Sequence, residues 1–434
     1  MGHAKTLSSK SSSPSIIKSS NVNLEPRNLA INDRDPFLPL QGLRVLDFTK
    51  VLAGPLCTQM LADMGAEVIK VEPIHAGDDT RSWPPFEHGE GTIFLAVNRN
   101  KRSLALDLKA PEGLAIAHRL AALADVVIES FGPGVAERLG IGDEALRALN
   151  PRLVYCSISG YGSAGPMKEG KGYDLIAQAF CGMLSMTGEP DGPPVRSPFS
   201  PVDQGTGMHA TIGIMGALMQ RERTGRGVKL EASLFDTAVG FLGYFLQGYW
   251  QRGTEPQRPG SGHESLCPYQ AFETADKPLI LGVANDALWQ AFCAVADADE
   301  LAADPRFMTG AARVQHRQET IDAVARIMRG KTRDVWLKLL EARGIPCSPV
   351  HTLGELDRHP QTLASDMILH YRAHNDHPLK SVAMPLRVDG QRAALRTPPP
   401  RLGQDSRAIL RETGYADELI EQWLARGVIA SADL

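Results

Sequence analysis

The sequence predicts an α/β fold in which a mostly parallel sheet is wrapped by helices and is followed by a smaller α+β domain. Short apolar runs of strand length alternate with segments of helical spacing over the first half of the chain. The composition then shifts abruptly to Pro, Gly, Ser and Arg around residues 256–263, which indicates a loop or linker. A chain of 434 residues is long enough for two domains that each bury a core.

The first half is expected to form βαβ units. Helical spacing is found at 56–64 and at 111–124, the second with Pro at the first helical position. Apolar runs of strand length flank or follow these helices at 43–48, 67–71, 103–108, 126–128 and 153–158. Parallel strands joined by crossover helices follow from this order, so we expect a large Rossmann-like domain over 38–230.

The second half is expected to continue with a linker at 231–264, a small α+β domain at 265–370 and a C-terminal return to the large domain at 371–434. The two strand-like runs of the small domain are 268–274 and 278–283. Helical spacing is found at 286–297, 313–329, 333–343, 405–414 and 417–426.

Composition excludes several classes of protein. Lys and Arg number 46 against 50 Asp and Glu, so no general basic field favours nucleic acid. No apolar stretch reaches the roughly 18 residues that a membrane span needs. The six cysteines are scattered without metal-ligand spacing, which indicates reduced thiols and neither a zinc site nor a disulfide framework. We therefore expect a cytoplasmic protein without bound metal.

Residues 1–37 are expected to be a disordered leader, because they are rich in Ser and show no helical or strand period. Met1, Gly2 and Thr6 formally match a myristoylation signal, and the Ser and Lys bias resembles a transit peptide, which would place the protein in the mitochondrial matrix. The Arg-rich amphipathic pattern of such peptides is missing, so an unstructured extension is the simpler interpretation.

Asp174 is the candidate catalytic residue. It follows the strand at 153–159 and the loop at 160–166, and it opens the next helical segment. A carboxylate there can cap the helix by accepting its first N–H groups. The helix dipole also keeps such a carboxylate ionised, and an ionised, positioned carboxylate can attack an activated acyl group. The two roles are compatible.

Residues 160–165 match the dinucleotide-binding pattern G-x-G-x-x-G after a strand. The pattern requires a helix to begin at the third glycine, whereas Pro166 and Lys168 follow here. An NAD-dependent oxidoreductase is therefore only a weak alternative.

Several motifs resemble family III CoA-transferases, a group that includes formyl-CoA:oxalate transferase and carnitine CoA-transferase. The resemblance covers about residues 40 to 405 in the same order. The matching segments are 47–55, 65–72, 77–81, 98–103, 131–134, 172–174, 224–227 and 344–347. Within the family, the strings at 77–81, 83–86, 97–101 and 268–272 are similar to the succinate-hydroxymethylglutarate CoA-transferase branch.

The resemblance implies the chemistry of the reaction. Asp174 would attack an acyl-CoA to give a mixed anhydride and then an aspartyl-CoA thioester, which the acceptor acid attacks in turn. CoA thioesters and carboxylic acids are then the substrates, and no permanently bound cofactor is needed. Gly260 and Gly262 belong to a candidate cover loop, with a plain interdomain linker as the alternative. The resemblance also implies an interlocked homodimer.

The resemblance also implies CoA contacts at five positions, which are Val51, Leu106, Lys109, Phe131 and Arg138. The sequence departs from the family at Pro73 and Ser159, where the formyl branch has basic residues. Arg81 and Arg102 are candidate substitutes for those cations.

Substrates and alternatives follow from the same comparison. The branch resemblance implies succinyl-CoA as donor and a dicarboxylic acceptor, with Arg196 as the candidate partner of its second carboxylate. The racemases of this family have Gly-His-Asp where this chain has Gly-Tyr-Asp at 172–174, and His209 is expected to be packed in a helix. A 2-methylacyl-CoA racemase and a non-catalytic CoA-binding protein remain alternatives.

Overall fold

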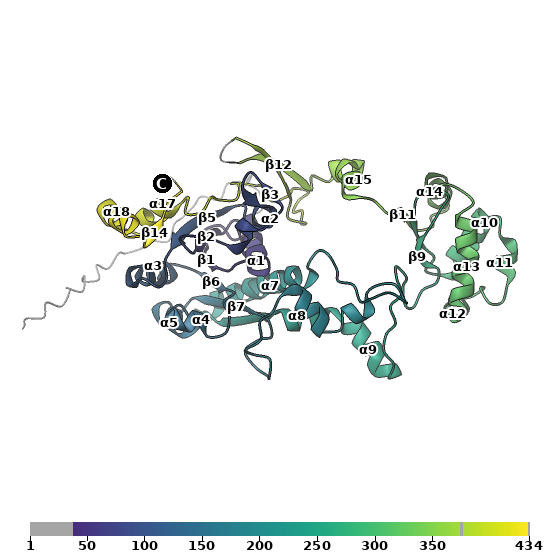
Figure 1. The fold of residues 1–434 in the computed structure, drawn as a ribbon, viewed down its shortest axis with the longest axis horizontal. Coiled ribbons are helices and arrows are strands. Elements are labelled where there is room, and N and C mark those ends of the chain that lie inside the picture. The colour runs from purple at the N-terminus through teal and green to yellow at the C-terminus, as the bar shows by residue number, and fades with distance from the viewer. Residues whose placement is uncertain (1–37, 374–375, 433–434) are drawn as a thin grey trace, which may run out of the picture. The chain divides into compact units, whose positions relative to one another are not determined.

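The computed structural model describes residues 38–373 and 376–432, so the leader predicted at 1–37 and its targeting motifs lie outside the described residues. A seven-stranded sheet in the order β14-β5-β2-β1-β6-β7-β8 organises the fold (Figure 1). Six of these strands are parallel, and β14 joins β5 in the antiparallel sense. The strands are β1 (Arg44–Phe48), β2 (Glu67–Glu72), β5 (Lys101–Leu106), β6 (Val126–Glu129), β7 (Val154–Ser159), β8 (Lys229–Ser233) and β14 (Ile429–Ala430).

Helices cover both faces of this sheet, because successive side chains of a strand point to opposite faces. Val45 of β1 packs in a core with α1 (Ala53–Asp63) and α7 (Pro201–Thr224). Leu46 packs in the opposite core, with α3 (Pro111–Ala122), α17 (Ser406–Glu412) and α18 (Asp417–Ala425). Burial on both faces explains why the parallel strands are largely apolar runs.

Shorter elements connect these layers. A two-stranded pair, β3 (Phe86–Glu87) and β4 (Glu90–Gly91), follows the 3-10 helix η1 (Asp79–Ser82). The helices of this part are α2 (Thr92–Val97), α4 (Val135–Arg138), α5 (Asp143–Leu149), α6 (Asp174–Phe180), η2 (Leu184–Met186), α8 (Leu234–Phe241) and α9 (Gly243–Arg252).

Residues 269–349 build a second core around a three-stranded antiparallel sheet, β11-β10-β9. Trp289, Phe292 and Trp336 are fully buried in it. Its strands are β9 (Tyr269–Phe272), β10 (Leu279–Gly282) and β11 (Cys347–Pro349). Its helices are α10 (Asp286–Val295), α11 (Asp299–Ala303), α12 (Gly310–Gln315), α13 (Arg317–Met328) and α14 (Arg333–Glu341).

The C-terminal segment returns to the large sheet. After α15 (Leu353–Arg358), α16 (Pro360–Ala364) and the hairpin of β12 (Ile368–Arg372) and β13 (Pro378–Val382), the backbone of Arg396 and Thr397 donates to the Asn100 side chain. The chain then reaches β14 at the edge of the sheet.

The predicted fold class is confirmed, with local differences. The helix predicted at 313–329 is divided at His316 into α12 and α13. Among the elements that were not predicted is the edge strand β8, which reads Lys-Leu-Glu-Ala-Ser and lacks the apolar run of a central strand. The helix expected around His209 is α7, which extends over 24 residues despite its glycines. The domain boundaries remain a prediction.

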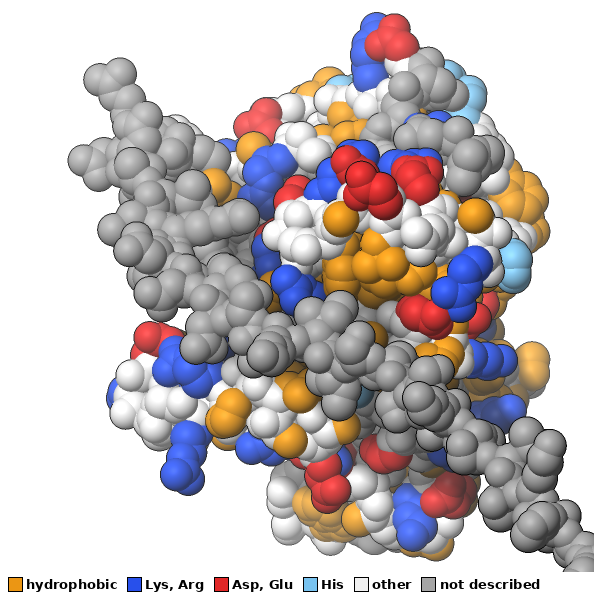
Figure 2. Space-filling model, turned by 90° about the vertical axis from the view of Figure 1, so that its left-hand side faces the viewer, with side chains coloured by type: hydrophobic (Ala, Val, Ile, Leu, Met, Phe, Trp, Pro, Cys, Tyr) orange, Lys and Arg blue, Asp and Glu red, His pale blue; other side chains and the backbone are white. Residues whose placement is uncertain are grey.

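Surface properties agree with the composition. Figure 2 shows Lys and Arg side chains interspersed with Asp and Glu over the coloured part of one face, without a broad basic field there. All six cysteines are free thiols. Among the described residues, none of the helices combines the length and apolar character that crossing a bilayer requires.

Glycine allows α7 to approach α1 closely. A Cβ atom added at Gly207 would lie 2.5 Å from the carbonyl oxygen of Ala53, the first residue of α1. Gly216 in the same helix has open space, because a Cβ atom added there would have no neighbour within 4 Å among the described residues. Contact between the two helices therefore depends on Gly207 and not on Gly216.

We expect Gly207→Ala to lower the free energy of unfolding by roughly 1–3 kcal/mol, because the methyl group overpacks the crossing of α1 and α7. Gly216→Ala is the matched control and should raise it by about 0.5–1 kcal/mol, because alanine favours the helix. Chemical denaturation of both variants measures the difference. Equal stability changes would contradict the packing argument.

Candidate active site

The turn between β1 and α1 has an unusual backbone. Val51 has φ = 72°, which is the left-handed region that β-branched residues rarely enter. Its N–H donates to Oδ1 of Asp78 at 3.2 Å, and Asp78 also accepts hydrogen bonds from the backbone and hydroxyl of Thr80. The structure around Val51 therefore supports a conformation that its own side chain disfavours.

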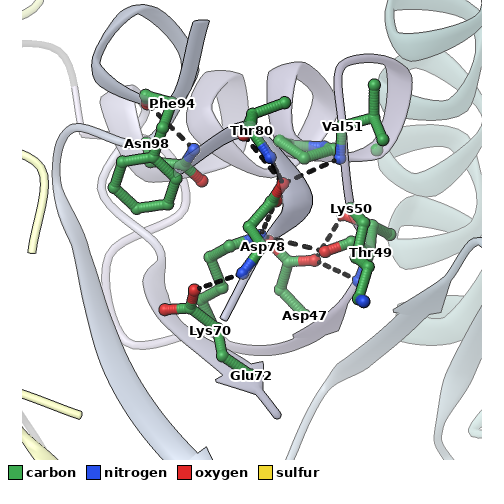
Figure 3. Close-up of polar contacts among 12 residues, drawn as sticks. Asp47, Thr49, Lys50, Val51, Lys70, Glu72, Asp78, Thr80, Phe94 and Asn98 are labelled. Atoms are coloured by element: carbon green, nitrogen blue, oxygen red, sulfur yellow. Dashed lines mark hydrogen bonds and ion pairs between the residues drawn. The ribbon is translucent and has the colours of Figure 1, made fainter. Parts of the chain in front are cut away.

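A buried ionic network holds this turn in place (Figure 3). The Lys70 ammonium donates to the carbonyl oxygen of Thr49 at 2.9 Å and lies 2.9 Å from Oδ2 of Asp78. Asp47 accepts from the backbone N–H of Thr49 at 2.8 Å, and its other oxygen lies 3.3 Å from the Lys101 ammonium. The side chains of all four charged residues are fully buried. The network thus binds the backbone on both sides of Lys50.

Burial and mutual attraction shift the pKa values in this network. Burial alone would raise the pKa of Asp78, but the Lys70 charge and the hydrogen bonds outweigh it and lower this pKa to about 2. The same balance lowers the pKa of Asp47. Burial lowers the pKa of Lys101 to about 8, despite the attraction of Asp47. The carboxylates therefore remain charged at neutral pH.

Asp174 is the first residue of α6, as predicted, but it does not cap that helix. Its side chain is 7% exposed. Oδ1 accepts the backbone N–H groups of Val202 and Asp203, at 2.9 and 3.1 Å, and these residues open the long helix α7. Oδ2 accepts from the Gln178 side chain. The carboxylate thus caps a different helix, whose N-terminal N–H groups stabilise its negative charge.

Two glycines set the backbone that precedes Asp174. Gly160 follows β7, and a Cβ atom there would lie 2.5 Å from the nitrogen of Gly172. A Cβ atom at Gly172 would lie 2.3 Å from Cα of Gly160. The residues between Gly160 and Tyr173 form turns and coil, so the helix that a dinucleotide site needs does not follow the glycines. These glycines bring two backbone segments together instead.

A pocket of about 330 Å³ lies beside Asp174, at the carboxyl ends of β1, β6 and β7. The order of the sheet reverses between β1 and β6, which is where ligands bind in open α/β sheets. The turn with Val51 forms one side, and Tyr173 and Asp203 belong to the lining near Asp174. Three lysines also line it, at positions 50, 168 and 171.

A second pocket, of about 410 Å³, lies at the carboxyl ends of β1, β2 and β5. Three predicted CoA contacts line it, namely Leu106, Lys109 and Phe131. Phe131 and Lys50 line both pockets, whereas Val51 lines only the first. The structure therefore brings four of the predicted positions to two adjacent pockets. The two departures from the family lie there too, with Ser159 in the first pocket and Pro73 in the second.

The predicted cation substitutes are engaged elsewhere. Arg81 is buried and donates to both oxygens of Glu72, and it also pairs with Glu90. Arg102 pairs with Glu67 and Glu412. Neither lines the two pockets, so the structure gives no support to either as a phosphate contact. Sequence reasoning missed Lys50, Lys168 and Lys171 for this role.

Arg138, the last residue of α4, is exposed and lines neither pocket, although its neighbour Leu139 lines the second.

The segment with the predicted cover-loop glycines is hydrogen-bonded to the loop that carries Arg196, the predicted acceptor-binding residue. Gly260, with φ = 60°, donates its N–H to the carbonyl oxygen of Gly188 at 3.0 Å. Gly262 donates to Pro259 in a tight turn of the same segment. Arg196 is exposed and precedes Ser197, whose N–H donates to Gln178 at 3.0 Å. Arg196 is therefore next in sequence to Ser197, which is connected to Asp174 through the Gln178 side chain.

The other candidate groups lie away from Asp174. His209 lies on α7, where its ring nitrogen is 3.0 Å from the Thr237 hydroxyl. Among the described residues, one group could hold a metal ion: Glu87, His88 and His377, which are partly exposed and line no part of the Asp174 pocket. The Glu87 carboxylate lies 3.4 Å from each imidazole, a distance that ion pairing also explains.

Comparison with known proteins assigns the family. The family model for CoA-transferase family III matches residues 40–406. The chain belongs to CoA-transferase family III. It is therefore an enzyme of the CoA-transferase type, as the motifs predicted, and CoA thioesters are consistent with both pockets.

Individual relatives in the family cover most of the chain. An acyl-CoA transferase of Fusarium pseudograminearum is 41% identical, over 90% of this chain and 88% of the relative. A succinyl-CoA:glutarate CoA-transferase of Mus musculus is 40% identical over 92% of each chain. The crystal structure of a CAIB/BAIF family protein from Brucella suis superposes with a TM-score of 0.78 and 36% identity, over 86% of this chain and 99% of that one.

We expect the buried network to make stability depend on acid pH. The pKa of Asp78 is lower in the folded state, so its contribution is present above about pH 4 and is lost as the pH falls towards 2. This loss should be roughly 2 kcal/mol in the free energy of unfolding. Asp78→Asn should abolish that component and, by removing the carboxylate that pairs directly with the buried Lys70, cost about 3–5 kcal/mol at pH 7.

Denaturant unfolding at a series of pH values measures both effects. The neighbouring Asp79→Asn is the control, because Asp79 is half exposed and pairs with Lys50 at the surface, a contact worth at most about 1 kcal/mol. The network argument is wrong if the two variants have the same stability and the same acid dependence.

Proposed function

We propose that the protein transfers CoA from succinyl-CoA to a dicarboxylic acid, with Asp174 as the covalent nucleophile. One observation carries the proposal: a buried carboxylate is held by the N-terminus of α7 beside a pocket at the switch point of the sheet. The relative that is named a succinyl-CoA:glutarate CoA-transferase supports the donor and the acceptor class.

Each step of the proposed reaction exchanges one activated acyl group for another of similar energy. The Asp174 carboxylate attacks the thioester carbonyl and expels the CoA thiolate, which leaves a mixed anhydride. The thiolate returns to the Asp174 carbonyl, which releases succinate and leaves an aspartyl-CoA thioester. The acceptor carboxylate attacks this thioester, and the thiolate then attacks the acceptor's carbonyl. Asp174 is regenerated without ATP.

The geometry suits these steps in two ways. The N–H groups of Val202 and Asp203 and the amide of Gln178 fix the Asp174 carboxylate, so little orientation is left to be gained in the transition state. Oδ1 accepts both backbone N–H groups of α7, whereas Oδ2 accepts from the flexible Gln178 side chain. Oδ2 is therefore the oxygen that α7 does not bind. The loop from Gly188 to Ser197 and the segment with Gly260 can exclude water from the anhydride.

We infer that CoA lies across both pockets. The adenine end suits the second pocket, which Leu106 and Phe131 line with apolar surface. The thioester end then reaches Asp174 past the turn with Val51. Lys50, Lys109, Lys168 and Lys171 supply positive charge along this path.

We propose a homodimer as the assembly. Helices α6, α7 and α8 contact one another and carry large exposed apolar side chains, as does α9. Large apolar side chains that gather on an exposed surface commonly mark a site of protein association. The residues are Leu175, Ile176, Phe180, Ile212, Met219, Phe241, Tyr244 and Trp250.

A racemase is the second candidate, but the site favours it less. Racemisation needs a second base that returns a proton to the opposite face of the substrate. The position that precedes Asp174 is Tyr173, and His209 contacts Thr237 instead of lining the pocket. Transfer without loss of the substrate α-proton distinguishes the two activities.

Asp174→Asn should reduce transfer by several orders of magnitude, because an amide cannot form the anhydride. The amide oxygen can still accept the N–H groups of α7, so the melting temperature should change little. Hydroxylamine added during turnover should modify the wild-type peptide that carries Asp174 and leave the variant unmodified, as measured by mass spectrometry. Substantial transfer by the variant, with deamidation excluded, would refute the covalent role.

Arg196→Gln should raise the apparent KM for glutarate far more than that for acetate, because the charge would pair with the second carboxylate. Arg326→Gln, at an exposed position of α13, is the control and should leave both values unchanged. Initial rates with each acceptor test this. If wild-type enzyme prefers monocarboxylates, the dicarboxylate assignment is wrong although the transferase assignment stands.

A further inference from the structure

A second carboxylate lies beside the nucleophile and has no part in the reaction described so far. Asp203 is the third residue of α7, and its backbone N–H donates to Oδ1 of Asp174. Asp203 lines the pocket together with Gly172 and Tyr173, the two residues that precede Asp174, so a substrate bound in this pocket would lie next to Asp203.

The two carboxylates have different surroundings. Asp174 accepts hydrogen bonds from two N–H groups of α7 and from the amide of Gln178. Burial and the nearby charge of Asp174 raise the pKa of Asp203 to about 7. The other charged groups that line the pocket are Lys50, Asp79, Lys168 and Lys171. The raised pKa therefore keeps the Asp203 carboxyl protonated below about pH 7.

We propose that Asp203 is a further catalytic residue that carries a proton to and from the CoA sulfur. The proposal rests on the function proposed above. When Asp174 attacks the thioester, the carbon–sulfur bond breaks and the sulfur leaves with its electron pair. The Asp203 carboxylic acid gives its proton to that sulfur, which leaves CoA as a thiol and Asp203 as a carboxylate.

The return step reverses this transfer. The thiol sulfur attacks an anhydride carbonyl while the Asp203 carboxylate takes the proton back, and the displaced carboxylate leaves with the other electron pair. Protons and charges balance in each direction, so no outside acid or base is consumed. Asp203 begins and ends each half-reaction protonated.

Electrostatic coupling between Asp174 and Asp203 determines when Asp203 gives up its proton. The charge of Asp174 holds the proton on Asp203 while the nucleophile is free. Acylation converts Asp174 to a neutral anhydride and removes this charge, so Asp203 becomes a stronger acid when the thiolate appears. The acid is therefore available when the leaving group needs it, and the base when the sulfur attacks.

Leaving-group dependence tests the proposal. We compare wild type and Asp203→Asn in the first half-reaction, measured as acylation of Asp174 by mass spectrometry, with succinyl-CoA and with the thiophenyl ester of succinate. Thiophenol is a much more acidic thiol than CoA and needs no proton to leave. Asp203→Asn should slow acylation by succinyl-CoA about a hundredfold and acylation by the thiophenyl ester much less. Asp334→Asn, at an exposed position of α14, is the matched control.

The pH profile gives an independent readout. Because the protonated form of Asp203 acts, wild-type kcat/KM should be level below about pH 7 and fall above it, and Asp203→Asn should lose that limb. Equal slowing with both donors, or an unchanged pH limb in the variant, would overturn the role of Asp203. Wild-type enzyme that transfers no CoA, or never acylates Asp174, would instead overturn the proposed function, so the two failures are distinguishable.

Discussion

Two backbone N–H groups at the start of α7 bind one oxygen of Asp174, and the geometry of the site depends on this interaction. It joins two helices that are separate in sequence, and it places the carboxylate where the partial positive charge of a 24-residue helix is concentrated. The close contact of Gly207 with α1 fixes α7, and the contact of Gly160 with Gly172 fixes the segment before Asp174. Close backbone packing therefore positions Asp174, the proposed nucleophile.

The opposite side of the pocket is fixed by charge. Asp47, Lys70, Asp78 and Lys101 are buried where one would expect apolar side chains, and such a cluster is seldom a gain in stability over a hydrophobic one. The cluster instead fixes the backbone of the turn, because its hydrogen bonds hold Thr49 and Val51 in one conformation. The substrate would then move between a rigid turn on one side and the rigid carboxylate of Asp174, the proposed nucleophile, on the other.

The parallel sheet and Asp174 were predictable because apolar runs, helical spacing and the Gly-Tyr-Asp motif are local in the sequence. The partners of Asp174 were not, since nothing local to residues 172–179 indicates that Val202 and Asp203 bind it from another helix. Arg81 and Arg102 were candidates for phosphate binding because a sequence shows charge without its partner, and Glu72 and Glu412 engage them only in the fold. Asp203 looked like one acid among fifty for the same reason.

Transfer of oxygen from the acceptor to Asp174 tests the central claim most directly. When glutarate labelled with oxygen-18 attacks an aspartyl thioester, the bridging oxygen of the anhydride comes from glutarate and stays on Asp174 after the thiolate departs with the glutaryl group. We predict that the peptide with Asp174 gains heavy oxygen during turnover with succinyl-CoA, and that other acidic peptides do not. Label that appears only in succinate would show direct attack of glutarate on succinyl-CoA, and would contradict a covalent Asp174.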